Sequence, residues 1–291
     1  MTIVGLGLIG GSLGLALRQC AEVGEVVGMD ASPAVGERAL QRGLVDRVAA
    51  DPAAGVRGAD VVVLAVPVGS FGAVLEAIVP GLGEDALVTD VGSVKGPVAA
   101  EAEDLLGGRA RFLGGHPLAG TEDSGVEAAL EDLFQGALCI LTPTAETPSA
   151  DVERLAALWR LVGSEVVTMD PEEHDYVLAA TSHLPHMLAF SLIRTFGGLD
   201  KPERLGRFAA GGFRDLTRIA GSDPVMWRDI ALANAGPLLE MIDRFEARMD
   251  DLRRAIAAED GAALEAFFGE ARALRRGLPP RSHADEEQDD Q

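Results

Sequence analysis

Residues 2–12 read Thr-Ile-Val-Gly-Leu-Gly-Leu-Ile-Gly-Gly-Ser, so a short apolar run leads into the spacing G-x-G-x-x-G. After a strand, the first glycine of this pattern permits a tight turn, the second lets the backbone approach a pyrophosphate, and the third lets helix and strand pack closely. The helix that follows offers unpaired amides and a partial positive charge to phosphate. The loop therefore predicts a dinucleotide site, with a simple turn as the alternative. The expected cofactor contacts are Gly5, Leu6, Gly7, Leu8, Ile9 and Gly10.

An acidic residue follows the next predicted strand, Glu25–Met29, at the distance expected for a ribose contact. Asp30 can accept hydrogen bonds from both ribose hydroxyls, and its charge repels the extra phosphate of NADP, so NAD is the predicted cofactor. The alternative is that Asp30 simply ends a strand at a turn. Val66 and Pro67 end a further predicted strand at the same edge of the sheet and complete the expected cofactor contacts.

Strand and helix patterns alternate up to Asp170, which predicts a doubly wound parallel sheet of the α/β class. Several strands are apolar on both faces, as strands between two helix layers must be. The predicted strands are Thr2–Val4, Glu25–Met29, Val61–Val66, Ala86–Asp90, Arg111–Gly114, Ala137–Leu141 and Glu165–Met169. Ser32 and Ser149 are predicted to cap two of the intervening helices.

After Asp170 the pattern is helical almost to the end, with predicted helices at Pro171–Ser182, Leu184–Thr195, Pro202–Ala220, Pro224–Asp250 and Gly261–Arg275. We expect a dinucleotide-binding domain at 1–170, an all-helical domain at 171–278 and a disordered acidic tail at 279–291. The segment Pro224–Asp250 carries an apolar stripe, which predicts packing on other helices or on a second subunit.

Composition narrows the possible partners. The 291 residues carry 46 acids against 25 bases, for a formal net charge of −21, which repels nucleic-acid phosphates and anionic lipid headgroups. Two cysteines are too few for a disulfide framework or a metal site, which favours a reducing compartment. The apolar stretch Ile3–Leu17 lacks a preceding basic segment and is shorter than a membrane span. A cytoplasmic protein with no nucleic-acid or membrane partner is therefore expected.

Polar residues follow two strands at the predicted carboxyl edge of the sheet, where a nicotinamide would lie. A dehydrogenase that oxidises a carbinol must remove a proton while hydride leaves the same carbon, and neutral imidazole suits that role. His116, flanked by glycines, is the candidate base, with a structural histidine as the alternative. Ser93 is the candidate hydrogen-bond partner of the same oxygen, but capping of a helix near Gly96 is an equally serious interpretation.

Two histidines lie three residues apart in Ser182-His183-Leu184-Pro185-His186, where the helical region begins. Nothing nearby supplies further ligands at metal spacing, so no metal is predicted. Either histidine could instead donate to a substrate oxyanion, with a buried helix-end histidine as the alternative.

A basic pattern follows in Gly211-Gly212-Phe213-Arg214-Asp215-Leu216-Thr217-Arg218. Arg214 and Arg218 are four residues apart, hence on one helix face, where like charges repel unless an anion joins them. Pairing of Asp215 with Arg218 is one interpretation. The other is that a guanidinium group clamps a substrate carboxylate through two hydrogen bonds.

Taken in order, the motifs Gly5–Ser12, Asp90–Lys95, Gly115–Glu122, Ser182–His186 and Gly212–Asp229 resemble the prephenate/arogenate dehydrogenases of tyrosine biosynthesis. The resemblance extends from residue 2 to about residue 276. It implies a Rossmann domain, an all-helical dimerisation domain that forms a homodimer, and a site between the two domains. The implied reaction is the oxidative decarboxylation of the dicarboxylate prephenate by NAD, which yields 4-hydroxyphenylpyruvate, carbon dioxide and NADH.

The resemblance also implies roles for individual residues. His116 would bind the ring hydroxyl and assist its deprotonation, supported by Ser93, while Arg218 would hold the ring carboxylate and His186 the pyruvyl side chain. Thr121 and Glu122 would line the entrance, and Trp227 would reach the site from a second subunit. The remaining expected substrate contacts are Ser182, His183, Gly211 and Arg214, the last of which is lysine in some members of the family.

Two alternatives compete with this interpretation. A 3-hydroxyacid dehydrogenase or imine reductase of similar build would need a catalytic lysine or another polar residue on the interdomain helix, and neither Lys95 nor Lys201 lies on it. A dinucleotide-sensing protein would keep the fold without turnover. Within the resembled family, the residues do not decide between prephenate and arogenate, which differ by a keto or an amino group, although His183 and His186 favour prephenate.

Overall fold

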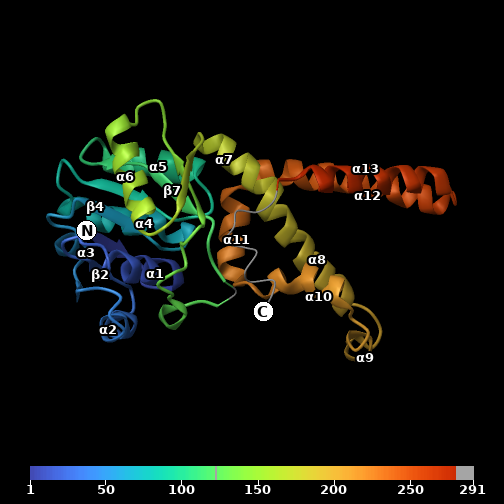
Figure 1. The fold of residues 1–291 in the computed structure, drawn as a ribbon, viewed down its shortest axis with the longest axis horizontal. Coiled ribbons are helices and arrows are strands. Elements are labelled where there is room, and N and C mark those ends of the chain that lie inside the picture. The colour runs from blue at the N-terminus through green and yellow to red at the C-terminus, as the bar shows by residue number, and fades with distance from the viewer. Residues whose placement is uncertain (122, 280–291) are drawn as a thin grey trace.

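A six-stranded parallel sheet forms the centre of the N-terminal domain in the computed structural model, which describes residues 1–121 and 123–279 (Figure 1). The strand order is β3-β2-β1-β4-β5-β6, and Thr2 pairs with Val27 on one side and Val62 on the other. This order confirms the predicted doubly wound fold, and its reversal between β1 and β4 marks the place where such sheets bind ligands. The strands are β1 (Thr2–Val4), β2 (Val27–Met29), β3 (Arg47–Val48), β4 (Val61–Leu64), β5 (Leu87–Asp90) and β6 (Arg111–Phe112).

A second, three-stranded sheet departs from the prediction. In it β7 (Gly114–Pro117) pairs antiparallel with β8 (Leu138–Thr142), which pairs parallel with β9 (Glu165–Thr168). The predicted strand Arg111–Gly114 is therefore wrong in its extent, because β6 pairs with β5 while Gly114 starts the second sheet. Gly114 permits this change of sheet, since a Cβ there would lie 2.4 Å from Oγ1 of Thr142.

Helices cover both faces of the six-stranded sheet, and strand side chains alternate between two apolar cores. Ile3 and Val63 enter one core together with Trp159, whereas Val4 and Leu64 enter the other. Successive residues of a strand face opposite sides, so both faces of a covered sheet must be apolar. The helices here are α1 (Leu8–Leu17), α2 (Pro33–Gln41), α3 (Pro52–Gly55), α4 (Phe71–Ile78), α5 (Gly96–Leu106) and α6 (Ser149–Leu161), with short 3-10 turns η1 (Val68–Ser70), η2 (Val79–Gly81) and η3 (Val126–Ala128).

The two predicted serine caps are not borne out as capping side chains. Ser32 occupies the N-cap of α2, but its side chain makes no capping hydrogen bond. Ser149 is the first residue of α6, whose N-cap is Pro148. In both helices a proline near the start, rather than a hydroxyl, marks the boundary, because its fixed φ suits the first turn.

The region after β9 is helical, as predicted, but two predicted helices are broken. The segment Pro202–Ala220 is interrupted between Gly206 and Gly211, and the segment Pro224–Asp250 is interrupted at Asn234. The elements are α7 (Pro171–Leu178), the π-helix η4 (Ala179–His183), α8 (Leu184–Gly197), α9 (Pro202–Gly206), α10 (Gly211–Arg218), the 3-10 turn η5 (Ile219–Gly221), α11 (Pro224–Ala233), α12 (Ala235–Ala257) and α13 (Gly261–Gly277).

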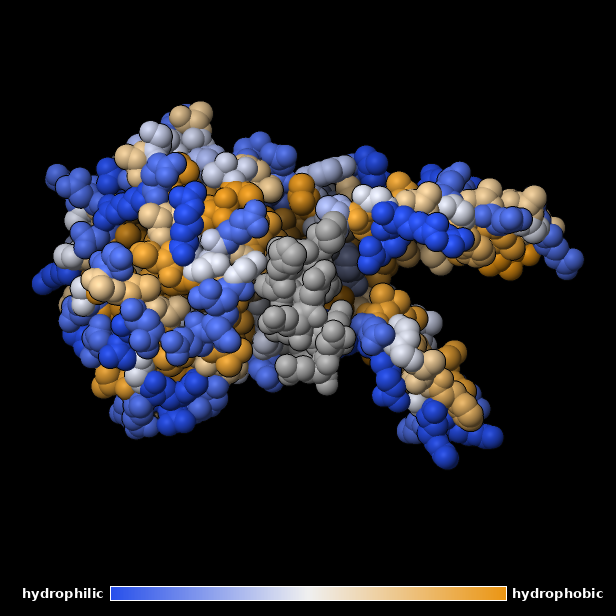
Figure 2. Space-filling model, in the orientation of Figure 1, coloured by the Kyte–Doolittle hydropathy of each residue, from blue (hydrophilic) through white to orange (hydrophobic). Residues whose placement is uncertain are grey.

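Two helical arms project from the body of the molecule, one formed by α8 and α10 and the other by α12 and α13 (Figure 1). Figure 2 shows hydrophobic side chains along both arms. The exposed ones include Phe208, Leu216, Leu239, Met249, Ile256, Phe268 and Leu274. Apolar surface of this extent is typical of a protein interface.

Within the described part of the chain, one helical run is long and apolar enough to cross a membrane by length and composition, Pro171–Gly197, with 22% of its apolar window buried. A single such run is weak evidence for a membrane span, because a core helix of a soluble protein passes the same test. The predicted acidic tail, apart from its first residue, lies outside the described residues.

Candidate active site

The glycine loop between β1 and α1 has the geometry that a dinucleotide needs. Gly5 has φ +93°, and a Cβ there would lie 2.2 Å from the carbonyl oxygen of Ala65 on the neighbouring connection. A Cβ on Gly10 would lie 1.9 Å from the carbonyl oxygen of Gly5, so this glycine lets the helix approach the loop. Beside Gly7, in contrast, there is nothing within 4 Å, which leaves open space where the backbone can approach a phosphate.

The start of α1 is free to receive an anion. Gly7 is its N-cap, no side chain caps it, and its first turn carries no acidic residue. Leu8 and Ile9 are partly exposed there, whereas the side chain of Leu6 is fully buried and can contribute only its backbone. Unpaired amides and the helix dipole at such an end suit a pyrophosphate.

Asp30 follows β2 and lies beside the glycine loop. Its Oδ2 accepts a hydrogen bond from the Leu6 amide at 3.0 Å, and its Oδ1 accepts one from the Ser32 amide at 2.9 Å. The side chain is partly exposed, as is Val66 after β4, and the neighbouring Pro67 is exposed. The carboxylate is therefore held next to the loop with lone pairs left for ribose hydroxyls. The glycine loop and Asp30 together fit a bound NAD.

A buried ion pair joins the end of β5 to β7. Nζ of Lys95 bonds Oδ2 of Asp90 and donates to the carbonyl oxygen of Gly115 at 2.8 Å. Asp90 also accepts from the Gly92 amide at 2.9 Å and from the Gly115 amide at 3.3 Å. The pair thus holds the loop that carries Ser93 against β7, the strand in which His116 follows Gly115.

His116 lies within β7, in the second sheet rather than in a loop of the first, but contacts between β5 and β7 bring it to the predicted edge. Its side chain is buried, and burial lowers its pKa well below the usual value, with a further lowering by the Lys95 charge and by His174 and His183. The imidazole is therefore neutral at neutral pH. Its Nδ1 lies 2.8 Å from Nε2 of His174.

Ser93 is half-buried in the loop between β5 and α5. The interpretation that it caps α5 is wrong, because the N-cap of that helix is Lys95. The amides of Lys95 and Gly96 donate instead to the two carboxylate oxygens of Asp175, both at 2.8 Å. Asp175 belongs to α7, so a carboxylate of the helical region caps the N-terminus of α5 in the other domain. The Ser93 hydroxyl is therefore not needed as a cap.

His183 is the buried member of the histidine pair. Its side chain is fully buried, and its Nδ1 lies 3.0 Å from Nδ2 of Asn234, which also donates to the carbonyl oxygen of Asp175. Burial lowers the pKa of His183 to about 4. Burial favours the helix-end alternative, but Nδ1 faces the Asn234 amide donor and Nε2 has no hydrogen-bond partner among the described residues, so donation from His183 to a substrate oxyanion stays a prediction. Ser182 lies beside it in the π-helix and is partly exposed.

His186 is the partly exposed member of the histidine pair. Its Nδ1 donates to the carbonyl oxygen of Ser182 at 2.9 Å, which leaves Nε2 as an acceptor in the neutral ring. Burial lowers its pKa, and the charge of Arg218 lowers it further. Its ring stacks on Trp227 with centroids 3.8 Å apart. Trp227 is thus packed beside His186 of its own chain, and the expectation that it reaches the site from a second subunit stays a prediction.

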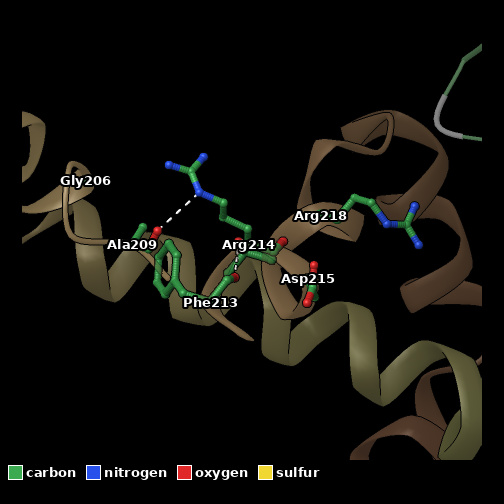
Figure 3. Close-up of a pocket in the computed structure, with 7 residues that line it drawn as sticks. Gly206, Ala209, Phe213, Arg214, Asp215 and Arg218 are labelled. Carbon is green, nitrogen blue, oxygen red and sulfur yellow. Dashed lines mark hydrogen bonds between the residues drawn. The ribbon is translucent and has the colours of Figure 1, made fainter. Parts of the chain in front are cut away.

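The two arginines of α10 diverge. Nε of Arg214 donates to the carbonyl oxygen of Ala209 at 3.2 Å, and Figure 3 shows the Arg218 guanidinium extending in the opposite direction. Both line a pocket of about 470 Å³ with Asp215 between them. The residues that line this pocket all lie between Gly206 and Arg218, in the helical region. Arg218, whose charge acts on His186, is the better placed of the two to hold a substrate carboxylate beside that histidine.

The remaining predicted contacts lie at the surface. Gly211 is exposed at the start of α10, and Thr121 is exposed in the loop after β7, where its Oγ1 accepts from the Asp123 amide at 3.2 Å. Glu122 lies outside the described residues. Among the described residues, no group of His, Cys, Asp and Glu side chains is arranged to hold a metal ion.

Sequence reasoning missed three residues that organise the site: His174, Asp175 and Asn234. His174 contacts His116, Asp175 caps α5, and Asn234 contacts His183. The only available signal was a histidine next to an aspartate at the start of a helix, which has no defined spacing to His116. Their roles depend on tertiary contacts across 51 to 80 residues of sequence.

Two family models and several known proteins match this chain over nearly its whole length. Residues 13–168 match the family description "Prephenate dehydrogenase, nucleotide-binding domain", and residues 170–270 match "Prephenate dehydrogenase, dimerization domain". The prephenate dehydrogenase of Bacillus subtilis is 41% identical over 96% of this chain and 76% of its own length. The cyclohexadienyl dehydrogenase of Zymomonas mobilis is 42% identical over 96% of this chain and 95% of its own.

A solved structure is similar over nearly the whole chain. It is the Aquifex aeolicus prephenate dehydrogenase in complex with hydroxyphenyl propionate and NAD⁺, with a TM-score of 0.88 and 39% identity. The match covers 96% of this chain and 97% of that chain.

Proposed function

This chain belongs to the prephenate dehydrogenase family of NAD-dependent oxidoreductases, and on that premise we propose that its substrate is prephenate, which it oxidises and decarboxylates to 4-hydroxyphenylpyruvate in tyrosine biosynthesis. The observation that carries the proposal is the buried neutral imidazole of His116, held by β7 against the loop of Ser93. NAD, when bound in the Gly5–Gly10 loop, supplies the hydride acceptor.

In this proposal His116 accepts the proton of the ring hydroxyl while hydride leaves the carbon that bears it. Ser93 donates a hydrogen bond to the same oxygen and orients it. The ring carboxylate then leaves as carbon dioxide, its bonding electrons make the ring aromatic, and the oxygen recovers a proton from His116. The side chain therefore ends each turnover as it began, neutral, and a base of this kind contributes about 10²–10⁴ to the rate.

The substrate carboxylates are assigned to the helical region. Arg218 pairs with the ring carboxylate, and His186, backed by its stack on Trp227, contacts the pyruvyl side chain. The entrance to the site, rather than the reacting carbon, is the proposed place of the remaining contacts, Thr121, Glu122, Gly211, Arg214 and Ser182. We infer domain limits of 1–170 and 171–278, so that the substrate lies between them.

A second substrate, arogenate, is favoured by one observation. Because Nδ1 of His186 donates to a carbonyl oxygen, the neutral ring offers only an acceptor at Nε2. An acceptor suits the ammonium group of arogenate, whereas a keto acid needs a protonated His186. Prephenate binding would then take up a proton and tighten as the pH falls, and arogenate binding would not.

The helical region matches the dimerization domain of the family, and the chain takes a small-molecule substrate. We infer that a second copy covers the apolar arms formed by α8 and α10 and by α12 and α13, and that the dimer works in the cytoplasm. No nucleic acid or membrane is needed by this account.

The test is to follow nicotinamide reduction spectroscopically with prephenate and with arogenate, each with NAD and with NADP. Fast turnover of prephenate with NAD is expected. Turnover of arogenate alone would assign the second substrate, and the absence of turnover in all four mixtures would contradict the proposed reaction.

A further inference from the structure

A chain of three buried polar side chains extends behind His116. Its Nδ1 lies 2.8 Å from Nε2 of His174, and Nδ1 of His174 lies 2.8 Å from Oδ1 of Asp175. The exposed fractions of the three residues are 7%, 0% and 4%. The three side chains connect β7 in the N-terminal domain to α7 in the helical region.

The acid at the end of the chain gives the hydrogen bonds a direction. An ionised carboxylate only accepts, so Nδ1 of His174 must donate to Asp175. In a neutral His174 the other nitrogen, Nε2, is then an acceptor, and it can pair only with a donor. Nδ1 of His116 must therefore carry its proton, which leaves Nε2 of His116 with a free lone pair.

Asp175 is itself held from several sides, so the direction cannot easily reverse. Besides His174, its carboxylate accepts from the amides of Lys95 and Gly96 at the start of α5. Its own carbonyl oxygen accepts from Asn234. Each carboxylate oxygen thus accepts at least one N–H bond, which fixes the orientation of the side chain.

We propose that His174 is a positioning residue, which holds His116 in the tautomer that presents a bare Nε2 to the substrate hydroxyl, with Asp175 fixing His174 in turn. This inference rests on the proposed function in that His116 is taken as the base. Without His174, the His116 ring could place its proton on either nitrogen, and a ring with Nε2 protonated cannot accept the hydroxyl proton.

The surrounding charges are consistent with a neutral ring in this role. The ionisable groups around His116 are Lys95 and its partner Asp90, His174 and Asp175 on α7, His183 on η4, and Cys139 on β8. Burial lowers the pKa of His116, and Lys95 acts in the same direction. When His116 takes up the substrate proton, Asp175 lies two hydrogen bonds away to stabilise the charge.

Two substitutions at position 174 test the two hydrogen bonds of His174 separately, one with His116 and the other with Asp175. In His174→Gln the amide can occupy the place of Nε2 and still accept from His116, whereas in His174→Asn it can occupy the place of Nδ1 and still donate to Asp175. We expect kcat to fall about 10- to 1,000-fold in H174N, and by no more than about tenfold in H174Q. KM and the affinity for NAD should change little, and the melting temperatures of the two variants should be similar.

The tautomer can be read without turnover, by ¹⁵N NMR of the imidazole nitrogens in wild-type protein. The chain has five histidines, so single substitutions assign the signals. His116 should show a protonated Nδ1 and a bare Nε2, and H174N should mix the two tautomers. A protonated Nε2 in the wild-type protein, kcat in H174N within about twofold of wild type, or equal losses in H174N and H174Q would overturn the proposal.

This design separates the inference from the proposed function. If wild-type protein turns over neither substrate, the proposed reaction fails, but the tautomer of His116 still reports on the chain of hydrogen bonds. If wild-type protein is active, His116→Asn is inactive and H174N is fully active, the reaction stands and the positioning role fails.

Discussion

Replacement of Lys95 by methionine should destabilise the N-terminal domain strongly. The Lys95 side chain is 0% exposed and that of its partner Asp90 is 3% exposed, so the substitution leaves a buried carboxylate without its counter-ion. Two amide donors to Asp90 remain, but the bond to the Gly115 carbonyl oxygen is lost. Breaking a buried pair in this way costs about 3–5 kcal/mol. At about 2–4 °C per kcal/mol, the melting temperature should fall by about 6–20 °C.

The matched control removes both charges. Burial lowers the pKa of Lys95 although Asp90 acts to raise it, so the buried ammonium group carries a desolvation cost. The double variant D90N/K95M should therefore recover most of the stability that K95M loses. Urea unfolding followed through the buried Trp159, at one fixed protein concentration, measures both variants. Loss of less than about 1 kcal/mol in K95M, or a double variant less stable than K95M, would refute this reasoning.

Three further predictions concern the cofactor loop and the histidines. Gly7→Ala should leave the unfolding free energy within about 1 kcal/mol of the wild-type value but weaken NAD binding, measured by fluorescence titration. Gly10→Ala should weaken NAD binding and also lower the unfolding free energy, because its Cβ would meet Gly5. Equal stability of the two variants would contradict the assigned glycine roles. Asp30→Ala should reduce the preference for NAD over NADP in steady-state kinetics, and an unchanged preference would exclude Asp30 as the ribose contact. The pKa of His183 is about 4 in the folded protein, against a reference value of 6.5, so the unfolded chain binds more protons between these two pH values. Acidification through this window should therefore cost up to about 3 kcal/mol of unfolding free energy. His183→Gln should flatten this part of the plot of unfolding free energy against pH.

The sequence alone was sufficient to locate the glycine loop and the doubly wound sheet. Gly5 and Gly10 each need the absence of a Cβ for a different local reason, a Cβ on Gly7 would meet only open space, and Asp30 bonds the loop next to it. These contacts connect segments whose order and spacing are visible in the chain, so pattern reasoning reaches them.

Two predicted helices, Pro202–Ala220 and Pro224–Asp250, are broken at positions that the sequence does mark, with glycines or with a proline. Pro237 lies in the first turn of α12, where a proline without an N–H is tolerated, so it marks a new helix start just after Asn234. The apolar stripe across both segments concealed this boundary, because α11 and α12 keep similar periodicity. The gap between Gly206 and Gly211 was likewise marked by glycines.

The organisation behind His116 could not be predicted. Asp175 caps α5, a helix that begins 79 residues earlier in the chain, and a serine at position 93 was the obvious local candidate. Nor does any periodicity show that β6 and β7 belong to different sheets, since the division depends on the close approach of Gly114 to Thr142. Contacts of this kind arise only when segments far apart in the sequence pack together.

The most direct test of the account compares wild-type protein with His116→Asn in prephenate oxidation with NAD, alongside the dissociation constant for NAD. The account predicts rapid NADH formation by the wild-type protein and a loss of kcat of at least about 100-fold in the variant, with NAD binding unchanged. Undiminished turnover by His116→Asn would show that another group removes the hydroxyl proton and would contradict the central claim.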